Sequence, residues 1–321
     1  MVHATSLGFP LCPNAYEAFD CFEKNSFSWA NDHRILENPS SRKAYSVLNS
    51  GRFGHYTYWY SDTEKTQLGT DLIGWLFMWD DVYPDGQFRR EPQKQFDTNH
   101  IYLKVYETGY AALHNSPFSH SLVDLKNRFA KYADNDWLSR FQLTLRDYFN
   151  GCLKEVLFRT ANVIPTFEQY KDFRHQSVGA YPVLDFMEIA QSSFLTSAMY
   201  DSSLFQDFRK TSSWILALTN DYFSLFKEEL ELDSFNSVIA IQNEFKIDKN
   251  EAIDFFVKEH AKEVSKMLAL EEEIKIKWGV NSPAAKYCFA ARAWMQGNLD
   301  WSLQTPRYQA SLLMQQSNER N

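Results

Sequence analysis

The chain has 321 residues, of which 44% are hydrophobic and 16% aromatic, so it is long enough and apolar enough to bury a large core. Its net charge of −8 argues against nucleic acid as a partner, because nucleic-acid-binding surfaces are rich in Lys and Arg. Gly (11) and Pro (10) are scarce, which favours long uninterrupted helices and predicts an all-α protein.

The predicted elements form one helical domain over residues 1–321, with an irregular lead-in at 1–13 and a C-terminal tail at 309–321. Segments without Pro or Gly, or with apolar residues at helical spacing, predict the helices. In chain order these are 14–24, 42–60, 65–82, 99–114, 117–133, 135–161, 166–193, 214–232, 233–246, 250–276 and 283–297. The polar segment 83–100, which contains two prolines and a glycine, is predicted to be a loop.

Two of these helices carry clearer local signals. Gly179 and Pro182 are predicted to interrupt the helical segment 166–193, because glycine frees the backbone and proline lacks an amide hydrogen. Asp248 and Glu251 have the spacing of a capping box and predict where the helix 250–276 begins.

The sequence disfavours a secreted, disulfide-bonded protein and a membrane-spanning one. The four cysteines show no paired spacing, and the N-terminus lacks a basic segment followed by an apolar one. The longest continuous apolar stretch, Leu72 to Trp79, is far shorter than the ~20 residues that span a bilayer. We therefore expect a cytoplasmic protein with no membrane span, and the sequence leaves open whether it is a monomer or a homodimer.

Three polar side chains share one face of the predicted helix 214–232. Asn220, Ser224 and Glu228 follow each other at steps of four residues, and each step rotates the side chain by only about 40° around the helix. Amide, hydroxyl and carboxylate oxygens are the ligands that a hard cation such as magnesium prefers. The structural alternative is an Asn that caps a helix and a Glu at the surface.

A second group of carboxylates ends the apolar helix 65–82. Asp80 and Asp81 are adjacent, and Asp85 follows four residues after Asp81. Like charges placed together are unfavourable unless a cation bridges them, and the C-terminus of a helix adds further negative potential. The alternative is a polar helix end that leads into a loop.

Two further segments contain groups that bind phosphate. Arg307 can form paired hydrogen bonds with phosphate oxygens, and Tyr308 can donate a hydroxyl. Arg174 precedes the predicted helix interruption, where it can reach an anion in a helical cavity. Taken singly, each of these residues could equally be an ordinary surface residue.

In this order and spacing the four segments resemble the class I terpene synthases, mainly the single-domain microbial kind. Residues 80–85 are similar to the family's aspartate-rich DDxxxD motif, and residues 220–228 to its Asn-Ser-Glu triad. Arg307 and Tyr308 are similar to its C-terminal Arg-Tyr pair, and Arg174 to its diphosphate-sensing arginine. The resemblance spans about residues 50–310.

This resemblance implies an all-α bundle with a central active-site cavity and three magnesium ions at its mouth. The ions would be held by Asp80, Asp81, Asp85, Asn220, Ser224 and Glu228. The diphosphate of a linear isoprenyl diphosphate would be bound by Arg174, Lys227, Arg307 and Tyr308. The expected reaction is ionisation and cyclisation of farnesyl diphosphate to a sesquiterpene, and the twenty-carbon geranylgeranyl diphosphate is the alternative substrate.

The resemblance also assigns roles at the cavity wall and at the helix interruption. Phe77 and Trp301 are predicted to line the cavity and to stabilise carbocations, with plain core packing as the alternative. At the interruption, Val178 is predicted to present its carbonyl to the cation, Gly179 to allow the bend, and Ser177 to link the carbonyl to Arg174.

One departure and two rival functions remain. Pro84 lies inside the aspartate-rich motif, so Asp85 is the ligand that we expect to contribute least. A trans-isoprenyl diphosphate synthase would need a second aspartate-rich motif where the triad stands. A non-catalytic helical binding protein would have no need of three separate diphosphate-binding motifs.

Overall fold

The computed structural model describes residues 20–81, 88–230, 233 and 235–309. These residues are helical with short connections and contain no strand, which confirms the predicted all-α class. The helices are α1 (Asp20–Asp32), α2 (Pro39–Leu48), α3 (Ser50–Thr57), α4 (Thr63–Asp81), α5 (Pro92–Thr108), α6 (Pro117–Phe129), α7 (Asn135–Ala161), α8 (Phe167–Ser177), α9 (Ala180–Ala190), α10 (Ser197–Tyr200), α11 (Ser203–Leu230), α12 (Ser237–Phe245), α13 (Lys249–Trp278) and α14 (Pro283–Ser302), with short 3-10 helices at Phe88–Arg90 and Ala111–Leu113.

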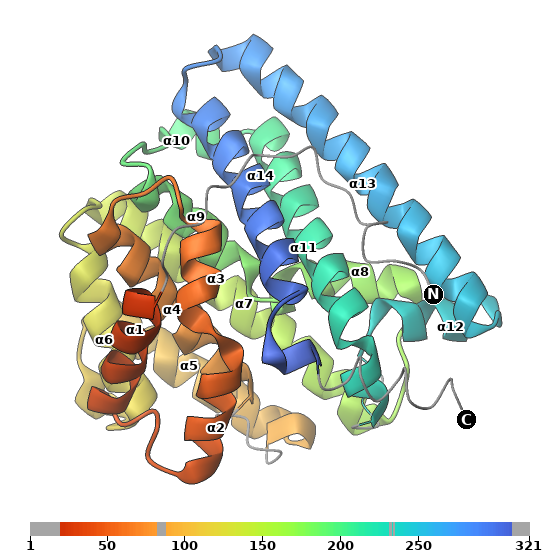
Figure 1. Cartoon of the computed structure of the whole chain (residues 1–321), viewed down its shortest axis with the longest axis horizontal. Helices are drawn as coiled ribbons and strands as arrows, with labels where there is room; N and C mark the ends of the chain where they lie inside the picture. Colours follow the sequence, from red (N-terminus) through yellow and green to blue (C-terminus); the bar gives the residue numbers. More distant parts are fainter. Residues whose placement is uncertain (1–19, 82–87, 231–232, 234, 310–321) are drawn as a thin grey trace.

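The helices pack into a single bundle (Figure 1). Helices α1 to α6 occupy the left part of the view, and α11 to α14 the centre and right. The long helix α13 runs along the outer edge and packs on α11 and α14. Helix α4 contacts α3, α6 and α9, and α7 contacts α5, α8 and α9. As a result, the C-terminal end of α4 and the interior faces of α7, α11 and α14 surround one central space.

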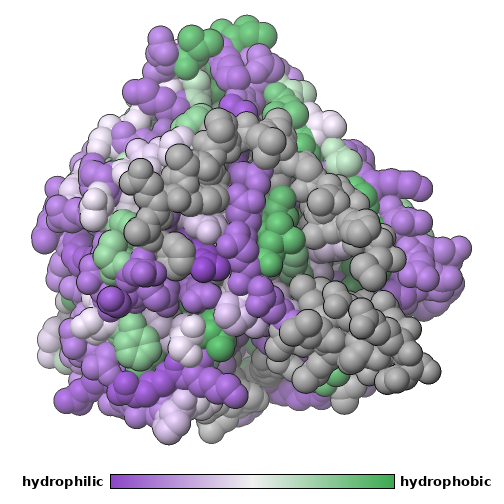
Figure 2. All heavy atoms as spheres, in the orientation of Figure 1, coloured by the Kyte–Doolittle hydropathy of each residue, from purple (hydrophilic) through white to green (hydrophobic). Residues whose placement is uncertain are grey.

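The core is unusually rich in large aromatic side chains. The largest fully buried ones are Trp75, Trp79, Trp137, Trp214, Trp301, Tyr45, Tyr58, Tyr102, Tyr106, Tyr148, Tyr170 and Tyr287. Each aromatic ring removes a large apolar area from water, so these side chains account for much of the hydrophobic stabilisation of the bundle. The face in view is mostly hydrophilic, with hydrophobic residues in small groups (Figure 2). Among the described residues, no helix is both long and apolar enough to cross a membrane.

Several helix boundaries were predicted correctly. Helix α7 spans the predicted 135–161, and α4 extends to Asp81, the last described residue of the predicted helix 65–82. The capping box of α13 is present, because Asp248 Oδ1 accepts from the amide of Glu251 at 2.9 Å and Glu251 Oε2 accepts from the amide of Asp248 at 3.1 Å. The interruption of 166–193 is also confirmed, with Gly179 in the left-handed region at φ 73°.

Other boundaries were wrong for local reasons. The predicted helix 42–60 is two helices, because Asn49 adopts the left-handed conformation at φ 53°. The second half of the predicted loop 83–100 belongs to α5, since Pro92 occupies the first turn, where a missing amide hydrogen costs nothing. Helix α1 extends to Asp32, eight residues beyond the predicted end (32 − 24), and α11 begins eleven residues earlier than predicted (214 − 203). The lead-in 1–13 and residues 310–321 of the tail lie outside the described residues.

Helix α14 continues through Gly297 to Ser302, although it was predicted to end near that glycine. Gly297 serves a close contact between helices. A β-carbon on Gly297 would lie 2.3 Å from the carbonyl oxygen of Tyr56, so only glycine lets α14 pack this tightly on α3. This contact brings the C-terminal helix against the wall of the central cavity.

Candidate active site

One cavity in the centre of the bundle collects nearly all of the predicted site residues. Residues from α3, α4, α5, α7, α8, α9, α11 and α14 line it. The predicted residues among them are Phe77, Asp80, Asp81, Arg174, Ser177, Val178, Gly179, Asn220, Ser224, Lys227, Glu228, Arg307 and Tyr308. Segments that are more than two hundred residues apart in the sequence therefore meet in one place. Asp85 and Pro84 lie outside the described residues.

Trp301 does not line this cavity, so its predicted place at the wall is wrong. It is buried, and its indole nitrogen donates to the carbonyl of Leu48 at 2.9 Å. Its ring stacks on Phe53, with centroids 4.1 Å apart, and lies 5.6 Å from the ring of Phe77. Phe53 and Phe77 form the wall and Trp301 supports them from behind.

The two described aspartates at the end of α4 have different surroundings. The Asp80 side chain is accessible from the cavity, but protein surrounds the cavity on most sides. The resulting desolvation, together with the negative charges of Asp81 and Glu155, raises the pKa of the Asp80 carboxyl. Asp81 is already paired, because Arg307 binds it through both guanidinium nitrogens, with Nη2 to Oδ1 at 2.8 Å. Lys227 Nζ lies 3.9 Å from Asp81 as well.

The three triad residues share the interior face of α11, as predicted. Asn220 accepts from Nη2 of Arg174 at 2.8 Å and donates to the hydroxyl of Tyr308 at 3.0 Å. Glu228 accepts from Nδ2 of Asn236 at 2.7 Å. Its burial and the nearby charge of Asp221 raise the pKa of the Glu228 carboxyl to about 8.

The chemistry of this end of the cavity fits a hard divalent cation. The hydroxyl of Ser224 is buried and forms no hydrogen bond of regular geometry among the described residues. It lies beside the Glu228 carboxylate, which interacts with it. Burial is the main cause of the raised pKa values of Asp80 and Glu228, and the negative charge of neighbouring carboxylates adds to it, so a bound cation would stabilise both in their ionised form. In the described part of the chain, no three His, Cys, Asp or Glu side chains converge as metal ligands. Asp81 instead pairs with Arg307.

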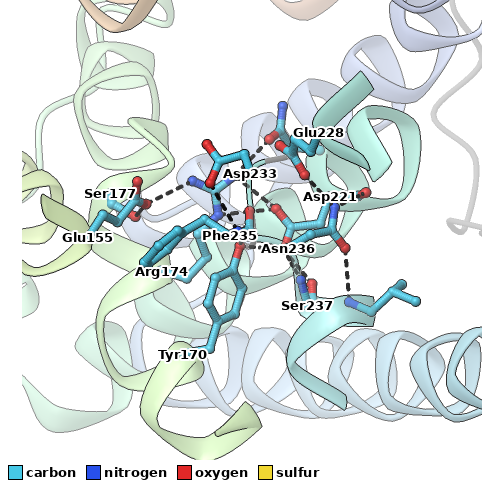
Figure 3. Close-up of polar contacts among 12 residues, drawn as sticks. Glu155, Tyr170, Arg174, Ser177, Asp221, Glu228, Asp233, Phe235, Asn236 and Ser237 are labelled. Carbon is cyan, nitrogen blue, oxygen red and sulfur yellow. Dashed lines mark hydrogen bonds and ion pairs between the residues drawn. The ribbon is translucent and has the colours of Figure 1, made fainter. Parts of the chain in front are cut away.

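Asp221, which the sequence analysis did not assign, organises the neighbouring polar groups (Figure 3). It is fully buried. Its carboxylate accepts from Nε and Nη2 of Arg174 at 3.1 and 2.8 Å, and from the hydroxyl of Tyr170 at 2.9 Å. It also accepts from the amide of Ser237 at 3.0 Å and from the Ser237 hydroxyl. Asp221 therefore fixes the position of Arg174 at the cavity.

Glu155 on α7 performs the linking that was predicted for Ser177. Arg174 Nη1 lies 3.3 Å from Oε1 of Glu155, and the Ser177 hydroxyl donates to the same oxygen. Arg174 and Ser177 are thus connected through Glu155, and no direct bond joins these two side chains (Figure 3). On the other side of Glu155, Arg159 approaches Oε2 at 3.3 Å and also pairs with Asp233.

The helix interruption lies at the cavity wall. Gly179 stands between α8 and α9, and Val178 precedes it. No backbone amide of the described residues outside the regular helices donates to the carbonyl of Val178. Pro182 lies in the first turn of α9 and does not itself make the bend, which comes from the left-handed Gly179. A carbonyl without a backbone partner can accept an interaction from the cavity.

Away from the charged end, the cavity wall is mainly apolar and aromatic. The wall residues that the sequence analysis missed include Phe53, Ile73, Trp79, Tyr148, Val183, Leu216 and Trp294. The α7 members had a detectable signal, because Tyr148, Cys152 and Glu155 lie on one face of a predicted helix at steps of four and three residues. Phe53 had no such signal, because its position at the cavity depends on the orientation of α3 relative to α2.

Comparison with known proteins identifies the family. Residues 71–266, more than half of the chain, match the family described as "Terpene synthase family 2, C-terminal metal binding". The chain is 27% identical over 307 residues to a germacrene A synthase of Nostoc punctiforme, covering 93% of this chain and 95% of the relative. It is 28% identical over 290 residues to a (+)-T-muurolol synthase of Roseiflexus castenholzii, covering 90% and 89%.

Solved structures agree on the fold. A variant of the reconstructed ancestral protein SVS_A2 superimposes with a TM-score of 0.85 at 18% identity, covering 93% of this chain and 88% of the other. A linalool/nerolidol synthase from Streptomyces clavuligerus gives a TM-score of 0.79 at 18% identity, covering 92% and 99%. The chain therefore belongs to terpene synthase family 2, the single-domain class I terpene cyclases, which are carbon–oxygen lyases acting on diphosphates.

Proposed function

We propose that this terpene cyclase ionises farnesyl diphosphate in a magnesium-dependent reaction and cyclises the resulting cation to a sesquiterpene. The observation that carries the proposal is the two-part cavity, in which an aromatic wall leads up to a cluster of carboxylates and cations from three sequence motifs. The fifteen-carbon substrate is supported by the T-muurolol synthase relative, whose name specifies cyclisation of (2E,6E)-farnesyl diphosphate. Geranylgeranyl diphosphate remains the alternative substrate.

The residues at the charged end supply the metal ligands in this proposal. Asp80 and Asp81 on one side, and Asn220, Ser224 and Glu228 on the other, form an all-oxygen donor set for magnesium. The resemblance to class I synthases implies three ions and adds Asp85. When bound, magnesium would neutralise negative charge on the diphosphate and so make it a better leaving group.

Four side chains would hold the diphosphate oxygens directly. Arg174, Lys227 and Arg307 bring three positive charges to the rim of the cavity, and Tyr308 adds a hydroxyl donor. Arg307 also lies over the ring of Phe77, with the guanidinium carbon 5.0 Å from the ring centroid. The diphosphate site and the aromatic wall are therefore contiguous.

The rest of the cavity would protect the cation from water. Aromatic faces such as those of Phe53 and Phe77 attract positive charge, each by about 2 kcal/mol when desolvated. The carbonyl of Val178 would face the developing cation from the helix interruption, where Gly179 supplies the bend. Glu155 connects the adjacent Ser177 to Arg174. Closure of the site around an apolar substrate prevents premature quenching.

The test is to incubate the purified protein with ten-, fifteen- and twenty-carbon isoprenyl diphosphates, with magnesium or with EDTA. Diphosphate release is measured in parallel with product analysis by gas chromatography–mass spectrometry. We expect magnesium-dependent release and a cyclic fifteen-carbon product from farnesyl diphosphate. Turnover of the twenty-carbon substrate alone would support the diterpene alternative, and release that is unaffected by EDTA would contradict the metal assignment.

A further inference from the structure

A second buried polar cluster lies behind the helix interruption, and none of its side chains lines the cavity. His175, in the last turn of α8, and Tyr181, in the first turn of α9, meet across Gly179. The His175 Nδ1 and the Tyr181 hydroxyl are 2.7 Å apart, and the rings meet edge-to-face at 5.7 Å. This hydrogen bond joins the two helix halves where the backbone ladder is interrupted.

Both partners of this bond are uncharged at neutral pH. Burial, reinforced by nearby positive charge such as that of Lys210, lowers the pKa of His175 to about 3. Burial also raises the pKa of Tyr181. At neutral pH the imidazole is therefore uncharged and the phenol keeps its proton. The Tyr181 hydroxyl can then donate to Nδ1 of His175 in the tautomer that carries the imidazole proton on Nε2.

A buried ion pair holds the Tyr181 side chain in place in the first turn of α9. The guanidinium carbon of Arg209, on α11, lies 4.0 Å from the centroid of the Tyr181 ring. Arg209 Nε and Nη2 each donate to the carboxylate of Asp185, on α9, at 2.8 Å. Nη2 also donates to the hydroxyl of Thr144, on α7, at 2.9 Å. The first turns of α9 are thus fixed to both α7 and α11.

The other half of the interrupted helix is fixed to α11 as well. The hydroxyl of Ser213 donates to the carbonyl of His175 at 2.5 Å, which satisfies one of the free carbonyls at the end of α8. Further along α11, Asp221 binds Arg174. The helix that carries the Asn-Ser-Glu triad therefore also sets the positions of both α8 and α9.

We propose that the bridge between His175 and Tyr181, supported by Arg209, is a positioning device for the cyclisation reaction. It fixes the angle between α8 and α9, and this angle sets the direction in which the carbonyl of Val178 faces the cavity. The inference rests on the function proposed above. Because the bridge touches neither the diphosphate site nor the cavity wall, its loss changes the fate of the cation and leaves substrate binding intact.

The sharpest test is Tyr181→Phe, which removes the hydroxyl and keeps the ring over Arg209. We expect kcat to fall about fivefold, the effect of one lost hydrogen bond, with KM unchanged. The product mixture should shift towards acyclic or less cyclised terpenes. The matched control is Tyr45→Phe on α2, which removes a buried hydroxyl that lies 2.5 Å from Oγ of Ser26.

A second pair of variants gives the same test from the other side. His175→Asn keeps an acceptor near the position of Nδ1 and should retain the wild-type product mixture, whereas His175→Leu should lose it. If Tyr181→Phe and His175→Leu both lower Tm as Tyr45→Phe does but make wild-type products at the wild-type kcat, the network is structural only and the inference is overturned. A wild-type protein that turns over no isoprenyl diphosphate would contradict the proposed function itself, whatever the variants do.

Discussion

Replacement of Asp221 by Asn should destabilise the protein and loosen Arg174 without altering the shape of the core. The carboxylate is fully buried and accepts hydrogen bonds from Arg174, Tyr170 and Ser237. Asparagine removes the charge and turns one acceptor into a donor that faces other donors. Removal of one partner of a buried ion pair costs about 3–5 kcal/mol.

The structure places the expected cost at the lower end of that range. In the variant, Arg174 would keep Oε1 of Glu155 at 3.3 Å and the amide oxygen of Asn220 at 2.8 Å, so its charge stays partly compensated. A loss of about 3 kcal/mol, at about 2 °C per kcal/mol for a large domain, lowers Tm by ~6 °C.

The assay is thermal unfolding followed by circular dichroism, with Asp254→Asn as the control. Asp254 is exposed on α13, so the control makes the same chemical change without breaking a buried contact. Diphosphate release should also fall in Asp221→Asn, because Arg174 is no longer held at the cavity. A Tm equal to that of the control would refute the assignment of Asp221 as the anchor of Arg174.

Three further outcomes follow from the site. Glu228→Gln and Asp80→Asn should each nearly abolish magnesium-dependent diphosphate release. Asp85→Asn should have a mild effect, because a proline precedes this residue. Near-normal turnover by Glu228→Gln at saturating magnesium would contradict the triad assignment. Phe53→Leu should change the product mixture, since the ring faces the cavity, and Trp301→Leu should mainly lower Tm; the reverse pattern would show that Trp301 acts on the cation. In EDTA, the free energy of unfolding should fall as the pH rises from 4.5 towards 8, because folded Glu228 retains a proton that the unfolded chain has lost, and Tm measured across this range should depend less on pH in Glu228→Gln.

The sequence was most informative where function depends on spacing within one helix. Asn220, Ser224 and Glu228 were placed on one face by helical periodicity alone, and the structure puts them there. The all-α class followed from long segments without Gly or Pro. Both inferences use local geometry, which the chain specifies without reference to distant residues.

The errors arose where distant segments decide the outcome. Gly297 was interpreted as a helix end, but it permits close packing of α14 on α3. Trp301 was placed at the cavity wall, while Phe53, which no local pattern marks, lies between it and the cavity. Glu155 carries no motif, and its link to Arg174 exists only because α7 and α8 pack together. Contacts of this kind depend on tertiary packing, so a single sequence does not show which residues meet.

The pairing of Asp81 with Arg307 means that the protein supplies its own counterions at the mouth of the cavity. A cation that takes Asp81 as a ligand competes with Arg307 for the carboxylate, and an anion that binds Arg307 competes with Asp81 for the guanidinium. Each ligand thereby frees the partner that the other needs, so the two bindings are thermodynamically linked and must favour each other equally. Neither a metal alone nor a diphosphate alone should bind tightly. Both must be present before the site is fully occupied and the reaction can begin.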